Sequence, residues 1–466
     1  MTSTEAAVDV AILLQPGTSR DIVHQLEGFI ASGQLPPGTA LPTIRELAAD
    51  TGLSRGLLAN AWALLRDRGL IVTRRRGGSF VATTDSTAPA AQPSPATSTV
   101  TAFDGWHALD LVTGHPDPKL QPDLASALAA ALHEPHTNDP TKVYITDRLR
   151  HVAAAEWPFA PEAWTTVGGA GEATVLVAEA VADLIGRDRP IAVAQPTTPG
   201  TVASLRGLGL HLLPIEHDEN GPAVHSLEQA LRAGAGAVLL QPSSSFSLSA
   251  GGDQQRLDEL AETIRHAPGG DGVIVIEDDV LGPLSSVQGL TVARALPGQV
   301  VRMRSYCRAY GVDLRTTVIG GPARIVERVR ALRSHGAAMN SRILQNALAV
   351  QLESRAATRV VERMERATAA RRALLAEQLD AQGTPWSAPV DPLLLWVPTA
   401  HENQALLALA AHGVVLSPSE HTFVTPPAQG HLRIAVTQLP NSPELSAQFA
   451  RLIGRAARGE LAPPGF

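Results

Sequence analysis

The sequence is poor in the residues on which disulfide frameworks, lysine chemistry and membrane spans depend. Its single cysteine, Cys307, excludes an internal disulfide and a thiolate metal cluster. Only two lysines occur, Lys119 and Lys142, so no lysine is present after residue 142. No basic segment precedes the short apolar run at the N-terminus, and no later apolar run is long enough to span a bilayer. These absences predict a protein of the reducing cytoplasm with no membrane partner.

Length and charge indicate more than one domain. A chain of 466 residues with 44% hydrophobic side chains suggests two or three globular domains with substantial cores. The net charge of −7 argues by itself against nucleic acid binding, but the charge is unevenly distributed. Residues 20–83 carry eight arginines and five acids, a balance of +3, which leaves −10 for the rest of the chain. A basic module joined to an acidic body is therefore expected.

Three amphipathic segments followed by two short apolar runs occupy the N-terminal part. The first segment begins near Ser19 and ends at Gly33, the second follows Thr43, and the third runs from Ser54 to Gly69. The second and third have the spacing of a helix-turn-helix. The apolar runs LIVT and SFVAT, joined by RRRGG, read as two strands with an arginine-bearing turn, which is the pattern of a wing.

The stretch SGQLPPGTALPTIRELAADTGLSRGLLANAWALLRDRGLIVTRRRGGSFV resembles the winged helix of GntR-type transcription regulators along its whole length. The resemblance implies that Arg45 and Arg55 reach DNA and that the wing tip enters the minor groove, and arginine forks suit phosphates and guanine edges. Gly56 and Ala59 stand where the family often has polar or basic residues, so base contacts are expected to be fewer or to shift to Asn60. The alternative is a winged helix for protein contacts, with its arginines on a solvated face. The residues expected at the DNA are Thr43, Arg45, Ser54, Arg55, Asn60, Arg74, Arg75, Arg76 and Gly77.

Farther along, the chain alternates helices with buried apolar runs. The runs TTVGG, PIAVAQP, GAVLLQPS, GVIVIEDD and TTVIGG read as strands, and helices are predicted over 171–186 and 253–267. This alternation predicts an α/β domain whose largely parallel sheet is covered on both faces, with sites at the carboxyl ends of the strands. A helical run over 323–382 leads into a smaller α+β part. The predicted domains are a winged helix over 11–83, a linker rich in Ala, Pro, Ser and Thr over 84–105, and an α/β domain over 106–466, with its large part at about 106–335 and its small part at about 336–466.

The stretch RMRSYCRAYGVDLRTTVIGGP, residues 302–322, reads as a short strand, a tight polar segment, an arginine and a Gly-Gly turn. In order and spelling, the large domain resembles fold-type I aminotransferases. With the winged helix in front, nearly the whole chain resembles the MocR subfamily of GntR regulators. The resemblance implies a degenerate site for pyridoxal phosphate, with Asp278 at the pyridine nitrogen and with Ser305, Arg315 and the Gly169-Ala170-Gly171 turn at the phosphate.

Other positions of the implied site are altered. Thr198 stands where an aromatic residue stacks on the cofactor ring, and Val280 stands where a tyrosine is usual. The polar loop usually spelled with His, Gln, Pro and Thr is Ser244-Ser245 followed by Ser247-Leu248, and Ser243 next to it is also expected at the site. Arg433 matches the arginine that grips a substrate carboxylate as a bidentate fork. Simpler roles stay open for each position: Asp278 as a strand-end cap, the arginines as surface or dimer-interface residues, and the glycine turn as a plain strand-to-helix connection.

The family's Schiff-base lysine, three residues after the phosphate serine, is Arg308 in this chain. Arginine stays protonated and does not form an imine with an aldehyde under ordinary conditions, and no later lysine is available. Transamination by the usual route is therefore not expected. Arg308 is either neutral erosion of a dead site or a fixed cation for an anionic ligand. The second reading is favoured, because three arginines with few acids are costly to bury without an anion.

The sequence thus predicts a cytoplasmic DNA-binding transcription regulator that binds double-stranded operator DNA as a head-to-tail homodimer. Its aminotransferase-like part is expected to dimerise and to sense a small anionic or amino-acid-like ligand, with no catalysis, no covalently bound pyridoxal phosphate and no metal. Two alternatives stay open. One is a constitutive regulator whose large domain is purely structural, and the other is an aminotransferase-like protein that binds pyridoxal phosphate non-covalently.

Overall fold

The structure, a computed structural model, consists of two compact units, residues 1–99 and 100–466, each with its own apolar core. The predicted linker over 84–105 and the predicted wing tip, Arg75 to Gly77, lie outside the described residues. The domain boundaries taken from the sequence therefore stay predictions. The described residues are 14, 17–31, 34–67, 70–74, 78–82, 109–112, 114–336 and 338–461.

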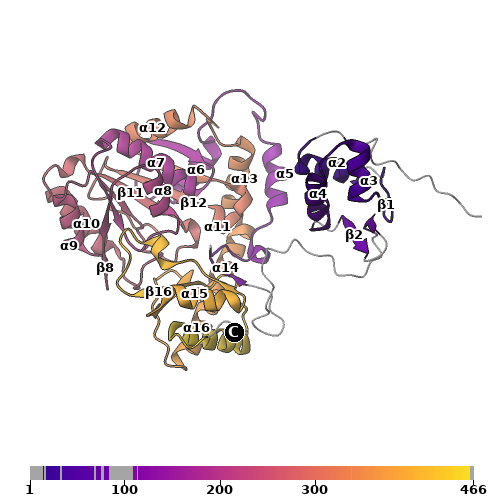
Figure 1. Ribbon diagram of the computed structural model, residues 1–466. Helices are drawn as coiled ribbons and strands as arrows, with labels where there is room; N and C mark the ends of the chain where they lie inside the picture. The colour runs from indigo at the N-terminus through magenta and orange to yellow at the C-terminus, as the bar shows by residue number, and fades with distance from the viewer. Residues whose placement is uncertain are drawn as a thin grey trace, which may run out of the picture. The chain divides into compact units, whose positions relative to one another are not determined.

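The small unit has the helices and the antiparallel sheet of a winged helix (Figure 1). Its sheet has the strand order β1-β3-β2, and β1 is too short for its pattern to be visible in the sequence. Apolar side chains from all three helices and from the sheet meet in one core, which includes Ile22, Leu47, Leu58 and Val81. The elements are α2 (Ser19–Ala31), β1 (Ala40–Leu41), α3 (Ile44–Thr51), α4 (Arg55–Asp67), β2 (Ile71–Arg74) and β3 (Gly78–Val81).

Local hydrogen bonds determine where α3 and α4 begin. Thr43 Oγ1 accepts from the backbone N–H of Glu46, and the Glu46 carboxylate accepts from the backbone N–H of Thr43 at 2.9 Å. Gly52 ends α3 with a φ of 72°, in the left-handed region that favours glycine. Ser54 Oγ then accepts from the backbone N–H of Leu57. These caps fix the start of α4, the predicted recognition helix.

The large unit is built on a seven-stranded sheet with the order β5-β13-β12-β11-β10-β6-β7. The five strands from β7 to β12 are parallel, and β13 runs antiparallel to both of its neighbours. The sheet is therefore largely parallel, as the apolar runs predict. The strands are β5 (Ala163–Val167), β6 (Ile191–Ala194), β7 (Leu212–Ile215), β10 (Ala237–Leu240), β11 (Ile274–Asp279), β12 (Val300–Ser305) and β13 (Thr317–Gly321).

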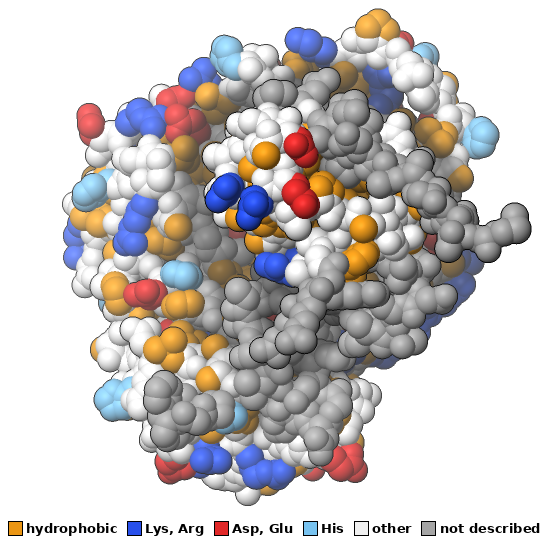
Figure 2. Space-filling model, turned by 45° about the vertical axis from the view of Figure 1, so that its right-hand side comes forward, with side chains coloured by type: hydrophobic (Ala, Val, Ile, Leu, Met, Phe, Trp, Pro, Cys, Tyr) orange, Lys and Arg blue, Asp and Glu red, His pale blue; other side chains and the backbone are white. Residues whose placement is uncertain are grey.

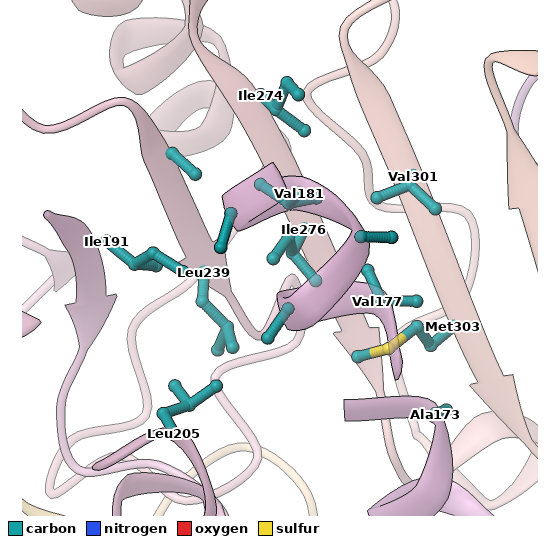
Figure 3. Close-up of a cluster of buried hydrophobic side chains, with 14 of the residues drawn as sticks. Ala173, Val177, Val181, Ile191, Leu205, Leu239, Ile274, Ile276, Val301 and Met303 are labelled. Carbon is teal, nitrogen blue, oxygen red and sulfur yellow. The ribbon is translucent and has the colours of Figure 1, made fainter. Parts of the chain in front are cut away.

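Successive residues of the strands point to opposite faces, and both faces are covered by helices (Figure 1). Ile276 of β11 belongs to one core, whereas its neighbour Val275 belongs to the other. Figure 3 shows Val177 and Val181 of α7 in the first core with Ile276. Helices α7 (Ala170–Ile185), α8 (Thr201–Gly207) and α12 (Ala323–Arg333) cover the first face, and α9 (Val224–Arg232) and α10 (Gln254–His266) cover the second.

Gly320 and Gly321 lie within β13, so the Gly-Gly turn expected from the sequence is wrong. A Cβ at Gly320 would lie 2.9 Å from Pro161 Cγ and 3.0 Å from a ring carbon of Trp157. A Cβ at Gly321 would lie 2.9 Å from the carbonyl oxygen of Val300. The glycines are needed because other chain segments approach this strand closely, not because the chain bends.

The remaining elements form the helical layers and a small C-terminal part, which confirms the predicted α+β subdomain. The helical run predicted over 323–382 consists of α12 and two further helices, α13 and α14. The short strand β4 pairs in parallel with β15 of the C-terminal part. Within the described residues, no helix combines the length and apolarity that crossing a bilayer requires. The elements are β4 (Leu109–Asp110), α5 (Leu124–Leu132), α6 (Asp147–Ala155), β8 (His217–Asp218), β9 (Gly221–Pro222), α11 (Cys307–Tyr310), α13 (Arg342–Glu353), α14 (Arg355–Asp380), β14 (Leu394–Thr399), α15 (Glu402–Ala411), β15 (Val414–Val415), β16 (Gly430–Ala435) and α16 (Pro443–Ala457).

Candidate functional site

A cavity of about 270 Å³ lies at the carboxyl ends of the central strands. Asp278 and Ser305 lie at the ends of β11 and β12, Gly169 follows β5, and Thr198 follows β6. Of the residues predicted for the ligand site, Ser243 and Arg433 alone are not part of the cavity wall. The wall is formed by His115, Gly169, Ala170, Gly171, Thr174, Thr198, Pro199, Gly200, Thr201, Ser204, Asp278, Val280, Ser305, Cys307, Arg308, Val312 and Arg315.

One end of the cavity has the features of an anion site. Gly169 is the N-cap of α7, with a φ of 130° and no side-chain cap, so the first turn of a long helix faces the cavity. The guanidinium of Arg315 packs against this turn. A Cβ added at Gly169 would lie only 3.5 Å from Arg315 Cζ. Arg315 itself has a φ of 42°, an uncommon left-handed backbone for an arginine. A phosphate-like group would be suited by three features together: the N-terminus of α7, the guanidinium of Arg315 and the nearby Ser305.

Asp278 lies on the cavity wall and accepts two hydrogen bonds. Its Oδ2 accepts from Thr198 Oγ1 at 3.3 Å and from Gln241 Nε2 at 3.3 Å. Gln241 also donates to Thr198 Oγ1 at 2.5 Å. Burial raises the pKa of Asp278 to about 6, and the two hydrogen bonds oppose this shift. Gln241 is a member of the site that the sequence motifs do not indicate, since it only follows a buried strand.

Arg308 brings a positive charge to the cavity wall, and the charge of Arg433, which is not part of the wall, lies close enough to interact with it. Arg308 Nη1 donates to the carbonyl oxygen of Gly114 at 2.7 Å, and Arg433 Nη2 donates to that of Val112 at 2.5 Å. Burial, together with the charge of Arg308, lowers the pKa of Arg433 to about 10. Burial also lowers the pKa of Arg308. His115, which no sequence motif indicates, also lies on the cavity wall, and burial and the charge of Arg308 lower its pKa.

Ser243 does not contribute to the cavity, because its side chain points into a separate hydroxyl network. Its Oγ lies 2.6 Å from Ser245 Oγ, and Ser245 donates to Asp391 Oδ2 at 2.8 Å. Ser285 and Ser286 donate to the same buried carboxylate. Through Asp391, the serine-rich loop is therefore linked to the segment that contains Ser285 and Ser286.

A buried ion cluster lies on the sheet face opposite the cavity. Arg302 donates to Glu277 Oε2 and to Asp279 Oδ2, both at 2.8 Å, and Arg304 donates to Asp279 Oδ2 at 2.7 Å. All four side chains are at most 6% exposed. The alternation of β11 explains the separation, since Asp278 and Asp279 must point to opposite faces. No motif of the sequence indicates this cluster.

The predicted DNA contacts of the small unit are accessible where the structure describes them. Arg45, Ser54, Arg55 and Asn60 are exposed, and Thr43 is exposed although it caps α3. Arg74 ends β2, whereas Arg75, Arg76 and Gly77 lie outside the described residues. On the face of the molecule drawn in Figure 2, basic and acidic side chains are intermingled. The exposed arginines of the helix-turn-helix, Arg45 and Arg55, are therefore free of the core of the small unit.

Comparison with known proteins gives two family matches and relatives along most of the chain. Residues 18–81 match the bacterial regulatory proteins of the gntR family, and residues 109–445 match aminotransferase class I and II. The vitamin B6 salvage pathway transcriptional repressor PtsJ of Salmonella typhimurium is 27% identical over 432 residues, which cover 91% of this chain and 95% of PtsJ. The probable rhizopine catabolism regulatory protein MocR of Rhizobium meliloti is 25% identical and covers 88% of each chain.

Solved structures resemble the large unit. The α-aminoadipate aminotransferase LysN of Thermus thermophilus, complexed with N-(5'-phosphopyridoxyl)-L-leucine, gives a TM-score of 0.65 at 20% identity, covering 76% of this chain and 93% of LysN. The aspartate aminotransferase of Thermus thermophilus with maleate gives a TM-score of 0.63 at 20% identity, covering 75% of this chain and 91% of that enzyme. At this identity the likeness concerns the fold.

Proposed function

We propose that this chain, which belongs to the aminotransferase class I and II family and carries a gntR-family winged helix in front of that domain, is a DNA-binding transcription regulator, as MocR-type regulators are. Its aminotransferase-like part performs no transamination and senses a small anionic or amino-acid-like ligand. The observation that carries the proposal is Arg308 at the wall of the cavity, in a chain without lysine after residue 142. A guanidinium remains charged and forms no bond with an aldehyde, but it binds anions well.

The cavity fits the phosphate end of pyridoxal phosphate and lacks the means to attach it covalently. The backbone at Gly169 and Ala170 with Ser305 and Arg315 would bind the phosphate, and Asp278 would face the ring nitrogen. When bound, the cofactor supplies an aldehyde and an electron-withdrawing ring. Non-covalent binding of this cofactor is therefore the second candidate, and what favours it is that the predicted phosphate residues lie around one cavity.

A head-to-tail homodimer is the proposed state on DNA. Two winged helices would read paired half-sites, and their separation would set the half-site spacing. Ligand binding in the large unit would then act on operator affinity by changing which arrangement of the winged helices is favoured. Mass measurement of the full chain in solution, with and without operator DNA, tests the stoichiometry.

Replacing Arg55 with alanine should weaken operator binding by about 1–3 kcal/mol and relax sequence preference, because the exposed N-terminal end of α4 is where a recognition helix contacts base edges. The measurement is a binding isotherm with a duplex selected by the full chain from random sequences. Arg66→Ala, which removes an exposed arginine from the last turn of the same helix, is the matched control. Equal losses in both variants would contradict the assigned orientation of α4 and indicate general attraction to phosphates.

Sulfate should bind more tightly to the full chain as pH falls through about 6. The pKa of Asp278 is raised to about 6 by burial, so the negative charge beside the anion is lost as Asp278 takes up a proton. His115 gains charge only at lower pH, because burial and Arg308 lower its pKa, and it acts in the same direction. A gain of roughly fivefold is expected for removal of one such charge. Calorimetric titrations should show the pH dependence in the wild type and a flatter profile in Asp278→Asn. An equally steep profile in that variant would assign the effect to other groups.

A further inference from the structure

One buried arginine outside the cavity wall connects the two parts of the anion site, which are the first turn of α7 and Arg315. Arg333 is the last residue of α12 and is 7% exposed. Its Nε donates to Glu172 Oε1 at 2.9 Å, its Nη2 donates to Asn340 Oδ1 at 2.9 Å, and its Nη1 donates to the Thr166 carbonyl at 3.0 Å. The three nitrogens of the guanidinium thus hold three separate segments of the large unit.

The first connection runs through Glu172 to the turn that precedes α7. Glu172 Oε2 accepts from the backbone N–H of Gly168, and a Cβ at Gly168 would lie 2.6 Å from the same oxygen. Glu172 also belongs to the first turn of α7, where the N–H groups of a helix attract a carboxylate just as they attract a ligand anion. The ion pair with Arg333 neutralises Glu172 and holds it at Gly168. The first turn of α7 therefore remains available to an anion in the cavity.

The second connection runs through Asn340 to Arg315. Asn340 is buried, and its Nδ2 donates to the carbonyl oxygen of Arg315 at 3.4 Å. Arg315 has the left-handed backbone described above, which a residue with a side chain adopts only where its surroundings hold it. Its guanidinium packs against Gly169 at the start of α7. A fixed carbonyl on Arg315 therefore helps to fix the direction in which its side chain points.

We propose that Arg333 is a positioning residue for the anion site, which acts through Glu172 on the turn at α7 and through Asn340 on Arg315. The inference rests on the proposed function, because it names the residues that adapt the same cavity to an anion. If Arg333 were uncharged, the Glu172 carboxylate would lose its cation and would compete with the ligand for the N-terminus of α7. An arginine that lies outside the cavity wall thus favours anionic ligands.

Sulfate binding to the full chain, measured by calorimetry, tests the connection through Glu172. Arg333→Met keeps an unbranched side chain and removes the charge, so it should weaken sulfate binding about tenfold, because an uncompensated carboxylate repels the anion. Adding Glu172→Gln should return the affinity to within about threefold of the wild type, since glutamine carries no charge and still accepts from Gly168. Wild-type affinity in Arg333→Met, or a loss that the second change does not restore, would overturn this connection.

Arg330→Met is the matched control for Arg333→Met. Arg330 lies one turn earlier in α12, and its Nη2 donates to the carbonyl of Trp164 on β5, so it also joins this helix to the sheet. Its guanidinium lies over the ring of Tyr144. The control should lower the melting temperature and leave sulfate affinity within about twofold of the wild type. Equal losses of sulfate affinity in the two variants would show that Arg333 acts only on the stability of α12.

A double-mutant cycle tests the connection through Asn340. Asn340→Ala should weaken sulfate binding about threefold in the wild type and should have no effect in an Arg315→Gln background, because the lost contact acts through the Arg315 guanidinium. Equal losses in both backgrounds would overturn this connection. The cycle leaves Arg333 in place, so it decides the proposal even if Arg333→Met does not fold.

Hydrogen exchange without ligand separates the positioning role from anion sensing itself. In Arg333→Met the amide of Gly168 should exchange about tenfold faster than in the wild type, because the carboxylate that accepts its hydrogen bond is no longer held. Equal exchange in the two proteins, with sulfate bound by the wild type, would overturn the positioning role and leave anion sensing intact. If the wild type binds neither sulfate nor inorganic phosphate, the proposed anion sensing is overturned, and exchange at Gly168 still decides whether Arg333 holds the turn.

Discussion

Replacing Arg308 with lysine should give the protein the ability to bind pyridoxal phosphate covalently. The wild type should show no incorporation at residue 308, and Arg308→Lys about one cofactor per chain after borohydride reduction. The reason is chemical: a lysine amine attacks an aldehyde when it is deprotonated, and both burial and a neighbouring cation favour the deprotonated form. Position 308 has both features, since Arg308 is half-buried on the cavity wall and its charge acts on Arg433. Peptide mass spectrometry locates the added mass.

The chain supplies controls for this experiment. Lys119 and Lys142 occur outside the cavity wall in the wild type and the variant alike, so labelling there measures non-specific reaction. Adding Arg315→Gln to the lysine variant should reduce incorporation severalfold, because the phosphate end loses a guanidinium beside α7. Equal incorporation with and without the Arg315→Gln change would contradict the placement of the phosphate beside Arg315. A lysine variant that gains no label, while folding normally, would mean that the cavity does not bind this cofactor.

Much of the fold is predictable because strand and helix periods are local properties of the sequence. The apolar runs that end in EDD and in RMRS become β11 and β12, and parallel strands bring their carboxyl ends to one edge. Asp278 and Ser305 meet at the cavity for that reason. Gly169 joins them because a strand-to-helix turn follows β5. Arg315 joins them because it precedes β13, which runs antiparallel to β5 and β12 and therefore begins at the edge where those strands end. The predicted phosphate end is thus a consequence of topology.

The rest of the site depends on contacts that no local pattern records. Arg308 and Arg433 reach the carbonyls of Gly114 and Val112 across about two and three hundred residues of chain, respectively. The serine-rich motif suggests that Ser243 belongs to the ligand loop, but its hydroxyl is part of the hydrogen-bond network around Asp391. The Gly-Gly pair does not form a turn. Glycine is required at these two positions because neighbouring chain segments pack closely against the strand, and not because the backbone bends there.

Replacing Asp279 with alanine should destabilise the large unit by about 3–5 kcal/mol, because the change breaks a buried ion cluster and leaves two guanidiniums to one carboxylate. Arg302 would retain Glu277, but Arg304 would lose its buried carboxylate. Urea unfolding of the full chain, followed by tryptophan fluorescence, measures the loss in the transition of the large unit. Glu156→Ala is the matched control, because Glu156 is 53% exposed and lies 3.4 Å from Arg304. That control should change stability by less than about 1 kcal/mol.

The pH dependence separates a lost ion cluster from a simple cavity. Burial alone would raise the pKa of Asp279, but Arg302 and Arg304 reverse the effect and hold it below its ordinary value of 3.8. A depressed folded-state pKa contributes stability that is present above the unfolded-state value and is lost as pH falls through the folded-state value. The difference in stability between the wild type and Asp279→Ala should therefore be constant from about pH 7 to pH 5 and should shrink below about pH 4. A difference that stays constant down to acid unfolding would assign the loss to packing, and the ion pairs with Arg302 and Arg304 would then contribute little to the stability of this sheet.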